Sequence, residues 1–214
     1  MIRLYIFDFD GTLADTREII VRTNQEVQRR MGYPVLPASR IIQTIGIPLT
    51  DGIRAMFPEL PEEELPAWKQ VYREVFLEMK QILTPPLFPH VKETLETLHG
   101  RGCTLTVASS RGLESLQDFL REMGVAPVFS YVLGAENVSR AKPDPEPVQK
   151  TLRELGFAPE EALVVGDMPV DIRMGLGAGA RTCGVTFGNA DRPTLLAAGA
   201  HHVIDDFSEL LTIS

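Results

Sequence analysis

The sequence predicts an α/β fold, a doubly wound parallel sheet with a block of helices inserted after its first strand. Short apolar runs that are typical of buried strands alternate with helical patterns from about residue 88 onward, as in parallel sheets with right-handed crossovers. The stretch from about residue 15 to residue 83 differs, because it carries several helical patterns in succession and no convincing strand. We therefore expect an α/β core of residues 1–14 and 84–214 and an all-helical cap at residues 15–83.

The expected strands are nearly continuous apolar runs, which is the pattern of strands covered on both faces. They span residues 2–7, 104–108, 129–133, 162–165, 182–187 and 202–204. Two of the helical patterns between them stop at a glycine, a residue that commonly terminates a helix. One carries leucines at helical spacing before Gly124, and the other begins at Pro145 and stops before Gly156.

The inserted stretch carries four helical patterns, at about residues 16–30, 38–45, 50–56 and 62–83. The last pattern places large apolar side chains along one face, namely Leu65, Trp68, Val71, Tyr72, Val75, Met79 and Ile82. We interpret this stripe as packing rather than as a ligand site. The turn at Thr84, Pro85 and Pro86 marks the return to the core.

Composition and charge disfavour several classes of function. The 214 residues include 21 Lys and Arg against 29 Asp and Glu, a net charge of −8, so we expect no nucleic-acid partner. No apolar run approaches the roughly 20 residues of a membrane helix, and no secretory signal is recognisable, so a cytoplasmic protein is expected. Cys103 and Cys183 are expected to be buried thiols rather than a disulfide.

Polar residues stand where the expected strands end. In open parallel sheets, ligands bind at the carboxyl ends of the strands, where helices begin. The candidates are Asp8, Asp10 and Gly11 after the first strand, Ser109 and Ser110 after the second, Lys142 after the third, and Asp167 and Asp171 after the fourth. Carboxylates that converge on one edge repel one another unless protons or a cation compensate them. Because no His or Cys accompanies them, Mg²⁺ is a better match than Zn²⁺.

Carboxylate, metal, hydroxyl and ammonium groups together indicate phosphoryl transfer, which needs an in-line nucleophile and groups that stabilise the equatorial oxygens. We expect Asp8 to attack phosphorus, and Asp10 to protonate the leaving oxygen and then activate water. Ser109 and Lys142 would hold the phosphoryl oxygens, with Ser110 as a further candidate.

The remaining polar candidates concern the metal and the backbone. Asp167 is an expected Mg²⁺ ligand, and Asp171 would orient the ion or its water ligands. Gly11 allows the chain to turn sharply after the first strand, so that backbone N–H groups can face an anion.

The motifs resemble those of a known family. The string Asp8-Phe9-Asp10-Gly11-Thr12-Leu13-Ala14-Asp15-Thr16 is similar to the first motif of the haloacid dehalogenase-like phosphatases. Ser109 matches the second motif, Lys142 the third, and Gly166-Asp167 with Asp171 the fourth. The inserted helices resemble the helical cap of the phosphoglycolate phosphatase-like branch.

This resemblance spans the chain from Asp8 to Asp171 and implies a Rossmann-like core, Mg²⁺ dependence and an aspartyl-phosphate intermediate. It also implies a metal shell formed by Asp8, the carbonyl of Asp10 and Asp167, with Asp171 beside it. The chain departs from the family pattern at Met168, where a small polar residue is common.

Substrate selection is expected to come from the helical insertion. The loop at residues 45–49 holds Gly46 and Ile47 between two helical patterns and is a candidate to reach the site. Arg111 is interpreted either as a solvated side chain or as a contact for a second anionic group of the substrate. A closing cap favours a small phosphorylated metabolite such as phosphoglycolate. We expect no membrane partner, and a monomer or a small homo-oligomer.

Other functions stay open at this point. A phosphosugar mutase also keeps Asp8 and Asp10 but returns the phosphoryl group to its substrate. A phospho-aspartyl receiver, or a binding protein without turnover, is disfavoured, the former because Asp8 ends the first strand and a large insertion follows.

Two further patterns are rejected. The glycines at residues 175–180 fit a dinucleotide-binding pattern, but they close a helix and lead into a strand, the reverse of the required order. The histidines, His90, His99, His201 and His202, show no metal-ligand spacing.

Overall fold

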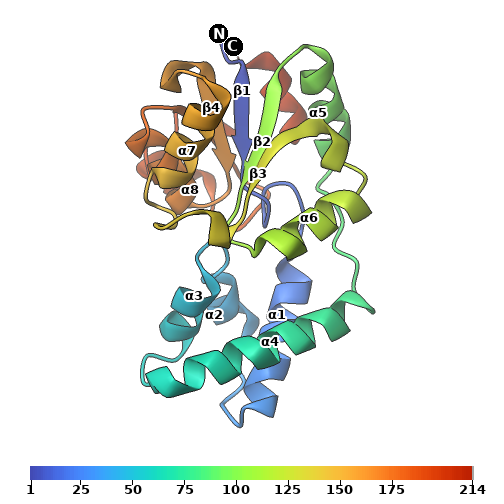
Figure 1. The fold of residues 1–214 in the computed structure, drawn as a ribbon, viewed down its shortest axis with the longest axis vertical. Helices are drawn as coiled ribbons and strands as arrows, with labels where there is room; N and C mark the ends of the chain where they lie inside the picture. The colour runs from blue at the N-terminus through green and yellow to red at the C-terminus, as the bar shows by residue number, and fades with distance from the viewer. Residues whose placement is uncertain (214) are drawn as a thin grey trace.

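The structure is a computed structural model that describes residues 1–213, and its centre is a parallel sheet (Figure 1). Within the described residues the sheet has six strands in the order β3-β2-β1-β4-β5-β6. The strands are β1 Leu4–Phe7, β2 Thr104–Ala108, β3 Phe129–Leu133, β4 Ala162–Gly166, β5 Arg181–Val185 and β6 His202–Ile204. All pairings are parallel, which confirms the predicted fold class.

Strand β1 is an inner strand of the sheet, and all four of its residues are buried. It pairs with β2 on one side and with β4 on the other, so that Leu4 stands opposite Thr104 and Ala162. Successive side chains of a strand point to opposite faces. Tyr5 and Phe7 accordingly belong to one hydrophobic cluster, and Leu4 belongs to another on the opposite face.

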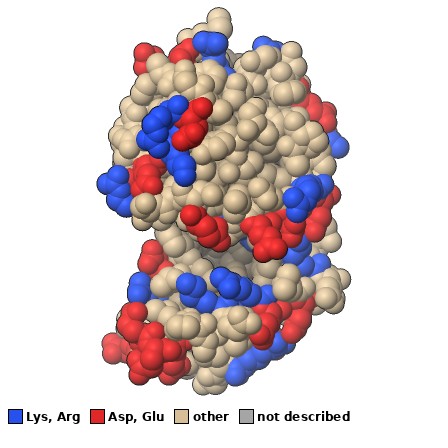
Figure 2. All heavy atoms as spheres, in the orientation of Figure 1, with Lys and Arg blue, Asp and Glu red and all other residues tan. Residues whose placement is uncertain are grey.

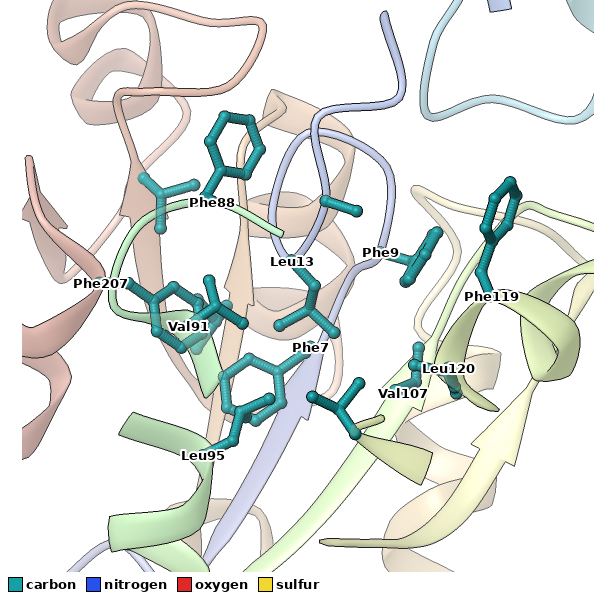
Figure 3. Packing of buried hydrophobic residues seen from close by; sticks show 14 of the residues in the cluster. Phe7, Phe9, Leu13, Phe88, Val91, Leu95, Val107, Phe119, Leu120 and Phe207 are labelled. Atoms are coloured by element: carbon teal, nitrogen blue, oxygen red, sulfur yellow. The ribbon is translucent and has the colours of Figure 1, made fainter. Parts of the chain in front are cut away.

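Helices cover both faces of the sheet. They are α5 Val91–Gly100, α6 Leu113–Glu122, α7 Glu146–Leu155, α8 Pro169–Gly177 and α9 Arg192–Ala197. Short 3₁₀ helices occur at Glu62–Glu64, Ala126–Val128, Ala135–Asn137, Pro159–Glu161 and Phe207–Thr212. Figure 3 shows Val91 and Leu95 of α5 packed against Phe7 and Phe207 in the larger cluster.

The helices α1 to α4 form a separate layer beyond the carboxyl ends of the strands (Figure 1), which we call the helical layer. They are α1 Arg17–Arg30, α2 Ala38–Ile42, α3 Leu49–Met56 and α4 Leu65–Lys80. Helices α1 and α4 pack against each other. The layer has its own apolar cluster, in which Trp68 is fully buried with ring centroids 5.0 Å from Tyr33 and 5.1 Å from Phe57.

These contacts confirm that Trp68 packs in the helical layer, but the expected stripe was too long. Helix α4 ends at Lys80, and Ile82 lies beyond it with 69% of its surface exposed. Helix α2 likewise ends at Ile42, three residues before the expected end.

The surface has a hollow between the core and the helical layer, and charged side chains gather along its edges (Figure 2). Of the helices in residues 1–213, none is long and apolar enough to cross a membrane. Cys103 and Cys183 are both free thiols, as expected, but Cys183 alone of the two is buried, and Cys103 is partly exposed.

Candidate active site

The polar residues that follow β1, β2, β3 and β4 converge at one edge of the sheet, facing the helical layer. Because β1 pairs with both β2 and β4, the ends of these three strands are neighbours. The side chains gathered there are all buried, namely Asp8, Asp10, Ser109, Lys142, Asp167 and Asp171. Residues that are more than a hundred positions apart in the chain are thus brought into one polar cluster.

Lys142 joins two of the carboxylates directly. Its Nζ donates to Asp8 Oδ1 and to Asp171 Oδ1, each at 2.7 Å. Burial lowers the pKa of Lys142, but the two carboxylates raise it above its ordinary value. The ammonium group therefore stays charged and fixes the side chain of Asp8 from one side.

Asp8 keeps one carboxylate oxygen without a partner. Its Oδ2 is buried and accepts no hydrogen bond from any described residue. Burial raises the pKa of Asp8 well above its ordinary value; Lys142 opposes this, and the neighbouring acids Asp171 and Asp167 add to it. An unpaired buried carboxylate oxygen is costly unless a ligand or an ion satisfies it.

Asp167 is held by two residues that the sequence analysis did not single out as site residues. Thr12 Oγ1 donates to Asp167 Oδ1 at 3.1 Å, and Asn189 donates to Oδ2 twice, from its backbone N at 2.8 Å and its side-chain Nδ2 at 2.7 Å. Burial, with the charge of Asp171, raises the pKa of Asp167 to about 7. The position of Asn189 just after β5, at the same edge of the sheet, is the signal that could have identified it.

These carboxylates fit a hard divalent cation. Asp8, Asp167 and Asp171 each offer an oxygen atom, and the three atoms lie within 4.8 Å of one another. Among the described residues, Lys142 pairs with two of these three buried carboxylates, Asp8 and Asp171, so a further positive charge would compensate the cluster. Oxygen ligands of this kind are those that Mg²⁺ prefers.

Two glycines leave room for Asp167. Gly11 has φ +86°, and a Cβ atom on it would lie 2.3 Å from Asp167 Oδ2. A Cβ atom on Gly188 would lie 2.3 Å from Asp167 Cβ and 2.4 Å from the carbonyl oxygen of Gly11. The sharp turn expected at Gly11 is therefore present, and Gly188 is a second close approach that the sequence analysis missed.

Asp10 forms an ion pair with Arg111. Arg111 donates from Nη2 to Asp10 Oδ1 at 2.6 Å and from Nε to Asp10 Oδ2 at 3.1 Å. Thr16 Oγ1 donates to Asp10 Oδ1 at 2.6 Å. The expectation of a solvated Arg111 was wrong, because its side chain is only 9% exposed and donates two hydrogen bonds to Asp10.

The hydroxyl groups of Ser109 and Ser110 have different surroundings. Ser109 Oγ is buried and accepts a hydrogen bond from the backbone N of Arg111 at 3.2 Å. Ser110 Oγ donates to the carbonyl oxygen of Gly46, at 2.8 Å. The side chain of Ser110 therefore attaches the loop of the helical layer to the core.

The loop that contains Gly46 and Ile47 lies against the core. Gly46 has φ +94°, and its Cα faces the side chain of Met168, whose Cγ would lie 3.6 Å from a Cβ on Gly46. Ile47 is half-buried. The backbone N of Met168 donates to Asp171 Oδ2 at 3.0 Å, so the unusual residue leaves this hydrogen bond in place.

A cleft of about 300 Å³ opens beside these groups. Ser109, Ser110 and Lys142 line it from the core, and Pro48 and Asp51 line it from the helical layer. A small ligand that reaches Lys142 from this side would therefore contact both parts of the chain.

The histidines and the glycine pattern lie outside this cluster. His90 pairs with Asp206, and His201 and His202 interact with Thr182 and Arg181. The glycines at 175–180 end α8 ahead of β5, which confirms the helix-to-strand order.

The sequence profile of one family matches most of the chain. The haloacid dehalogenase-like hydrolase profile covers residues 5–185. The chain belongs to this family. The matched segment extends from β1 to β5 and includes all of the clustered polar residues.

Similar proteins agree with this assignment. The chain is 35% identical to "Probable phosphatase IndB" of Dickeya dadantii, over 97% of this chain and 91% of that protein. It is 31% identical to "Pyrophosphatase PpaX" of Bacillus pumilus, over 99% and 96% of the two chains. The crystal structure of a predicted phosphoglycolate phosphatase from Haemophilus somnus superposes with a TM-score of 0.91 at 26% identity, over 99% and 97% of the two chains. The chain is therefore a phosphatase of the phosphoglycolate phosphatase-like branch, with a Rossmann-like core.

Proposed function

We propose that this phosphatase hydrolyses a small phosphorylated metabolite, depends on Mg²⁺, and works through a phosphorylated form of Asp8. The observation that carries the proposal is the state of Asp8, whose Oδ1 is fixed by Lys142 while its buried Oδ2 accepts no hydrogen bond from the described residues. A nucleophile needs this combination of a fixed orientation and an available oxygen.

In the first step, a carboxylate oxygen of Asp8 forms a bond to phosphorus while the bond from phosphorus to the leaving oxygen breaks. Asp10 lies two residues further along and transfers a proton to that leaving oxygen. Lys142 and the hydroxyl of Ser109 both line the cleft and interact with the phosphoryl oxygens.

In the second step, water attacks phosphorus and the bond between phosphorus and Asp8 breaks. Asp10 takes the proton from this water, so it returns to the protonated form that the first step requires. The cycle releases the alcohol and inorganic phosphate, and leaves Asp8 as it began.

Asp8 and Asp167 would hold the Mg²⁺, together with the backbone carbonyl of Asp10, and Asp171 would orient it. When bound, the ion compensates the charge of the phosphoryl group and of the buried carboxylates. Thr12 and Asn189 keep the Asp167 carboxylate in a fixed orientation for this purpose.

We propose that the helical layer is a cap that selects the substrate. Its loop contacts the core through the Gly46 carbonyl and Ser110, and Pro48 and Asp51 complete the cleft. A cleft of about 300 Å³ suits a small metabolite rather than a phosphoprotein. The similar proteins named above favour phosphoglycolate and pyrophosphate as the first substrates to test.

Phosphate release from a panel of small phosphates, with Mg²⁺ and with a chelator, tests this proposal. The panel contains phosphoglycolate, pyrophosphate, sugar phosphates, nucleotides and an aryl phosphate. We expect selective release that requires Mg²⁺, and borohydride reduction of the quenched enzyme should convert Asp8 to homoserine, which mass spectrometry detects. Isomerised sugar phosphate without phosphate release would instead identify a mutase, and full activity of Asp8→Asn would contradict the mechanism.

A further inference from the structure

Asp10 is fixed by a fork of hydrogen bonds that leaves one defined position open for a proton. Its Oδ1 accepts from Thr16 Oγ1 and from Arg111 Nη2, and among residues 1–213 its Oδ2 accepts from Arg111 Nε only. A carboxylate oxygen accepts about two hydrogen bonds in its plane. Oδ1 is therefore fully used, and Oδ2 retains one position.

In the proposed mechanism, that position would serve both steps. A proton on Oδ2 can pass to the leaving oxygen, and the emptied position can then accept a proton from water. Neither transfer breaks a hydrogen bond from Arg111 or Thr16, because all three bonds are accepted by other lone pairs. The fork thus keeps Asp10 in one orientation through the whole cycle.

The guanidinium group of Arg111 is itself held by aromatic rings from both parts of the chain. Its Cζ lies 5.9 Å from the ring centroid of Phe9, 5.0 Å from that of Phe119 and 5.2 Å from that of Phe76. Figure 3 shows Phe9 and Phe119 facing each other beside the turn that follows β1. Ser115 Oγ accepts a further hydrogen bond from Nη1, at 3.2 Å.

Phe76 is the only ring of the three that belongs to the helical layer. It lies on α4 and is 7% exposed. Its ring packs edge-on against that of Phe119, with the two ring centroids 6.0 Å apart. Ring faces attract a guanidinium group, most strongly where water is excluded. The position of α4 relative to the core therefore influences where the guanidinium group lies.

We propose that Arg111 is a positioning residue for the proton transfer by Asp10, and that Phe76 makes this positioning depend on the docked position of the helical layer. The inference rests on the proposed function, in which Asp10 is the acid and base. Arg111 is not placed as a contact for substrate, since both ends of its fork are occupied by Asp10.

Leaving-group dependence tests the role of Arg111. The value of kcat/KM is measured for phenyl, 4-nitrophenyl and 2,4-dinitrophenyl phosphate, whose leaving groups are progressively weaker bases and need a proton less. For Arg111→Met we expect a loss of about 10²-fold with phenyl phosphate and a loss of about threefold or less with 2,4-dinitrophenyl phosphate. Arg111→Lys keeps the charge but not the fork, and should recover part of the loss. Arg121→Met, an exposed arginine at the other end of α6, is the matched control.

A double-variant cycle shows whether Arg111 acts through Asp10. In the Asp10→Asn background, Arg111→Met should change kcat/KM for 4-nitrophenyl phosphate by less than about twofold, because no acid is left to position. A full additional loss in that background, or an equal loss with all three aryl phosphates, would overturn the proposal. If the unmodified enzyme shows no turnover that depends on Asp8, the proposed function itself fails. This result can be distinguished from the two outcomes that would overturn the role of Arg111.

Phe76→Leu tests the connection to the helical layer, because it keeps an apolar side chain and removes the ring face. We expect the same leaving-group pattern as for Arg111→Met, with a loss of about tenfold for phenyl phosphate. Leu77→Ala is the matched control on the next residue of α4, where 62% of the surface is exposed. Unchanged leaving-group dependence in Phe76→Leu would show that the position of Arg111 is independent of α4.

Discussion

Lys142 Nζ donates to Asp171 Oδ1 at 2.7 Å, and both side chains are almost completely buried. The same ammonium group donates to Asp8 at the same distance, so one lysine compensates two carboxylates. This arrangement connects the third expected motif to the first and the fourth, so we expect Lys142 to stabilise the fold in addition to its proposed role in phosphate binding.

Lys142→Met should therefore lower both activity and stability. Removing one partner of a buried ion pair typically costs about 3 to 5 kcal/mol, because the remaining charges lose their compensation. We expect the free energy of unfolding, measured by chemical denaturation without Mg²⁺, to fall by this amount, and to fall less with saturating Mg²⁺. We expect no measurable phosphatase activity. Lys150→Met is a suitable control, since within the described part of the chain that lysine donates only to the carbonyl oxygen of Asn137. Equal stability of the two variants would show that Lys142 does not compensate the acids.

Asp8→Asn should remove activity and leave the fold intact. The amide oxygen can still accept from Lys142, while the amide nitrogen takes the place of Oδ2, which accepts no hydrogen bond from the described residues. We expect phosphate release to fall by about 10³-fold or more, because the nucleophile is lost. Without Mg²⁺ the variant should also resist denaturation better than the unmodified protein, because one buried negative charge is gone. Lower stability under these conditions would contradict the electrostatic account of Asp8.

Gly11→Ala and Gly32→Ala separate backbone strain from crowding at the metal site. Both glycines have positive φ, at +86° and +75°, so both variants carry the conformational cost of about 1 to 2 kcal/mol. Only at Gly11 does the new Cβ atom meet a side chain, 2.3 Å from Asp167 Oδ2, whereas nothing lies within 4 Å at Gly32. Gly11→Ala should lose Mg²⁺ binding in calorimetry and phosphatase activity, and Gly32→Ala should keep both. Normal Mg²⁺ affinity in Gly11→Ala would show that Asp167 is not confined by this turn.

The fold and the main acids were predictable because each has a local signal. Apolar runs mark the strands, and the acids follow those runs directly, so Asp8 and Asp167 could be assigned to one edge without knowing any distance. The partners of those acids have no such signal. Asn189 reaches Asp167 from the loop after β5, and Arg111 reaches Asp10 from a position beside aromatic rings. Long-range packing determines both contacts, and neither residue type by itself indicates them.

Asn189→Leu should weaken Mg²⁺ binding without removing a ligand. Asn189 supplies two hydrogen bonds to Asp167 Oδ2, and the variant keeps only the one from the backbone. Loss of a partner that orients a metal ligand typically lowers affinity or activity by about 10- to 100-fold. Titration of Mg²⁺ in the phosphatase assay measures the shift, with Arg192→Gln as an exposed control three residues away. An unchanged Mg²⁺ requirement would show that the backbone hydrogen bond alone orients Asp167.

The stability of the Mg²⁺-free protein should fall as pH rises from about 4 toward about 7. Burial, with the charge of Asp171, raises the pKa of Asp167 to about 7 in the folded protein, against 3.8 as its ordinary value. Between these values the folded protein holds a proton that the unfolded chain has released, so raising the pH favours unfolding. Chemical denaturation with a chelator at pH 5 and pH 7.5 measures the difference in the free energy of unfolding between the two pH values. Asp167→Asn, whose side chain cannot titrate, should make this difference smaller. Mg²⁺ should stabilise the protein more at pH 7.5 than at pH 5, because protons compete with the ion for the carboxylates. Equal stabilisation by Mg²⁺ at both pH values would show that the ion is not held by the group that titrates here.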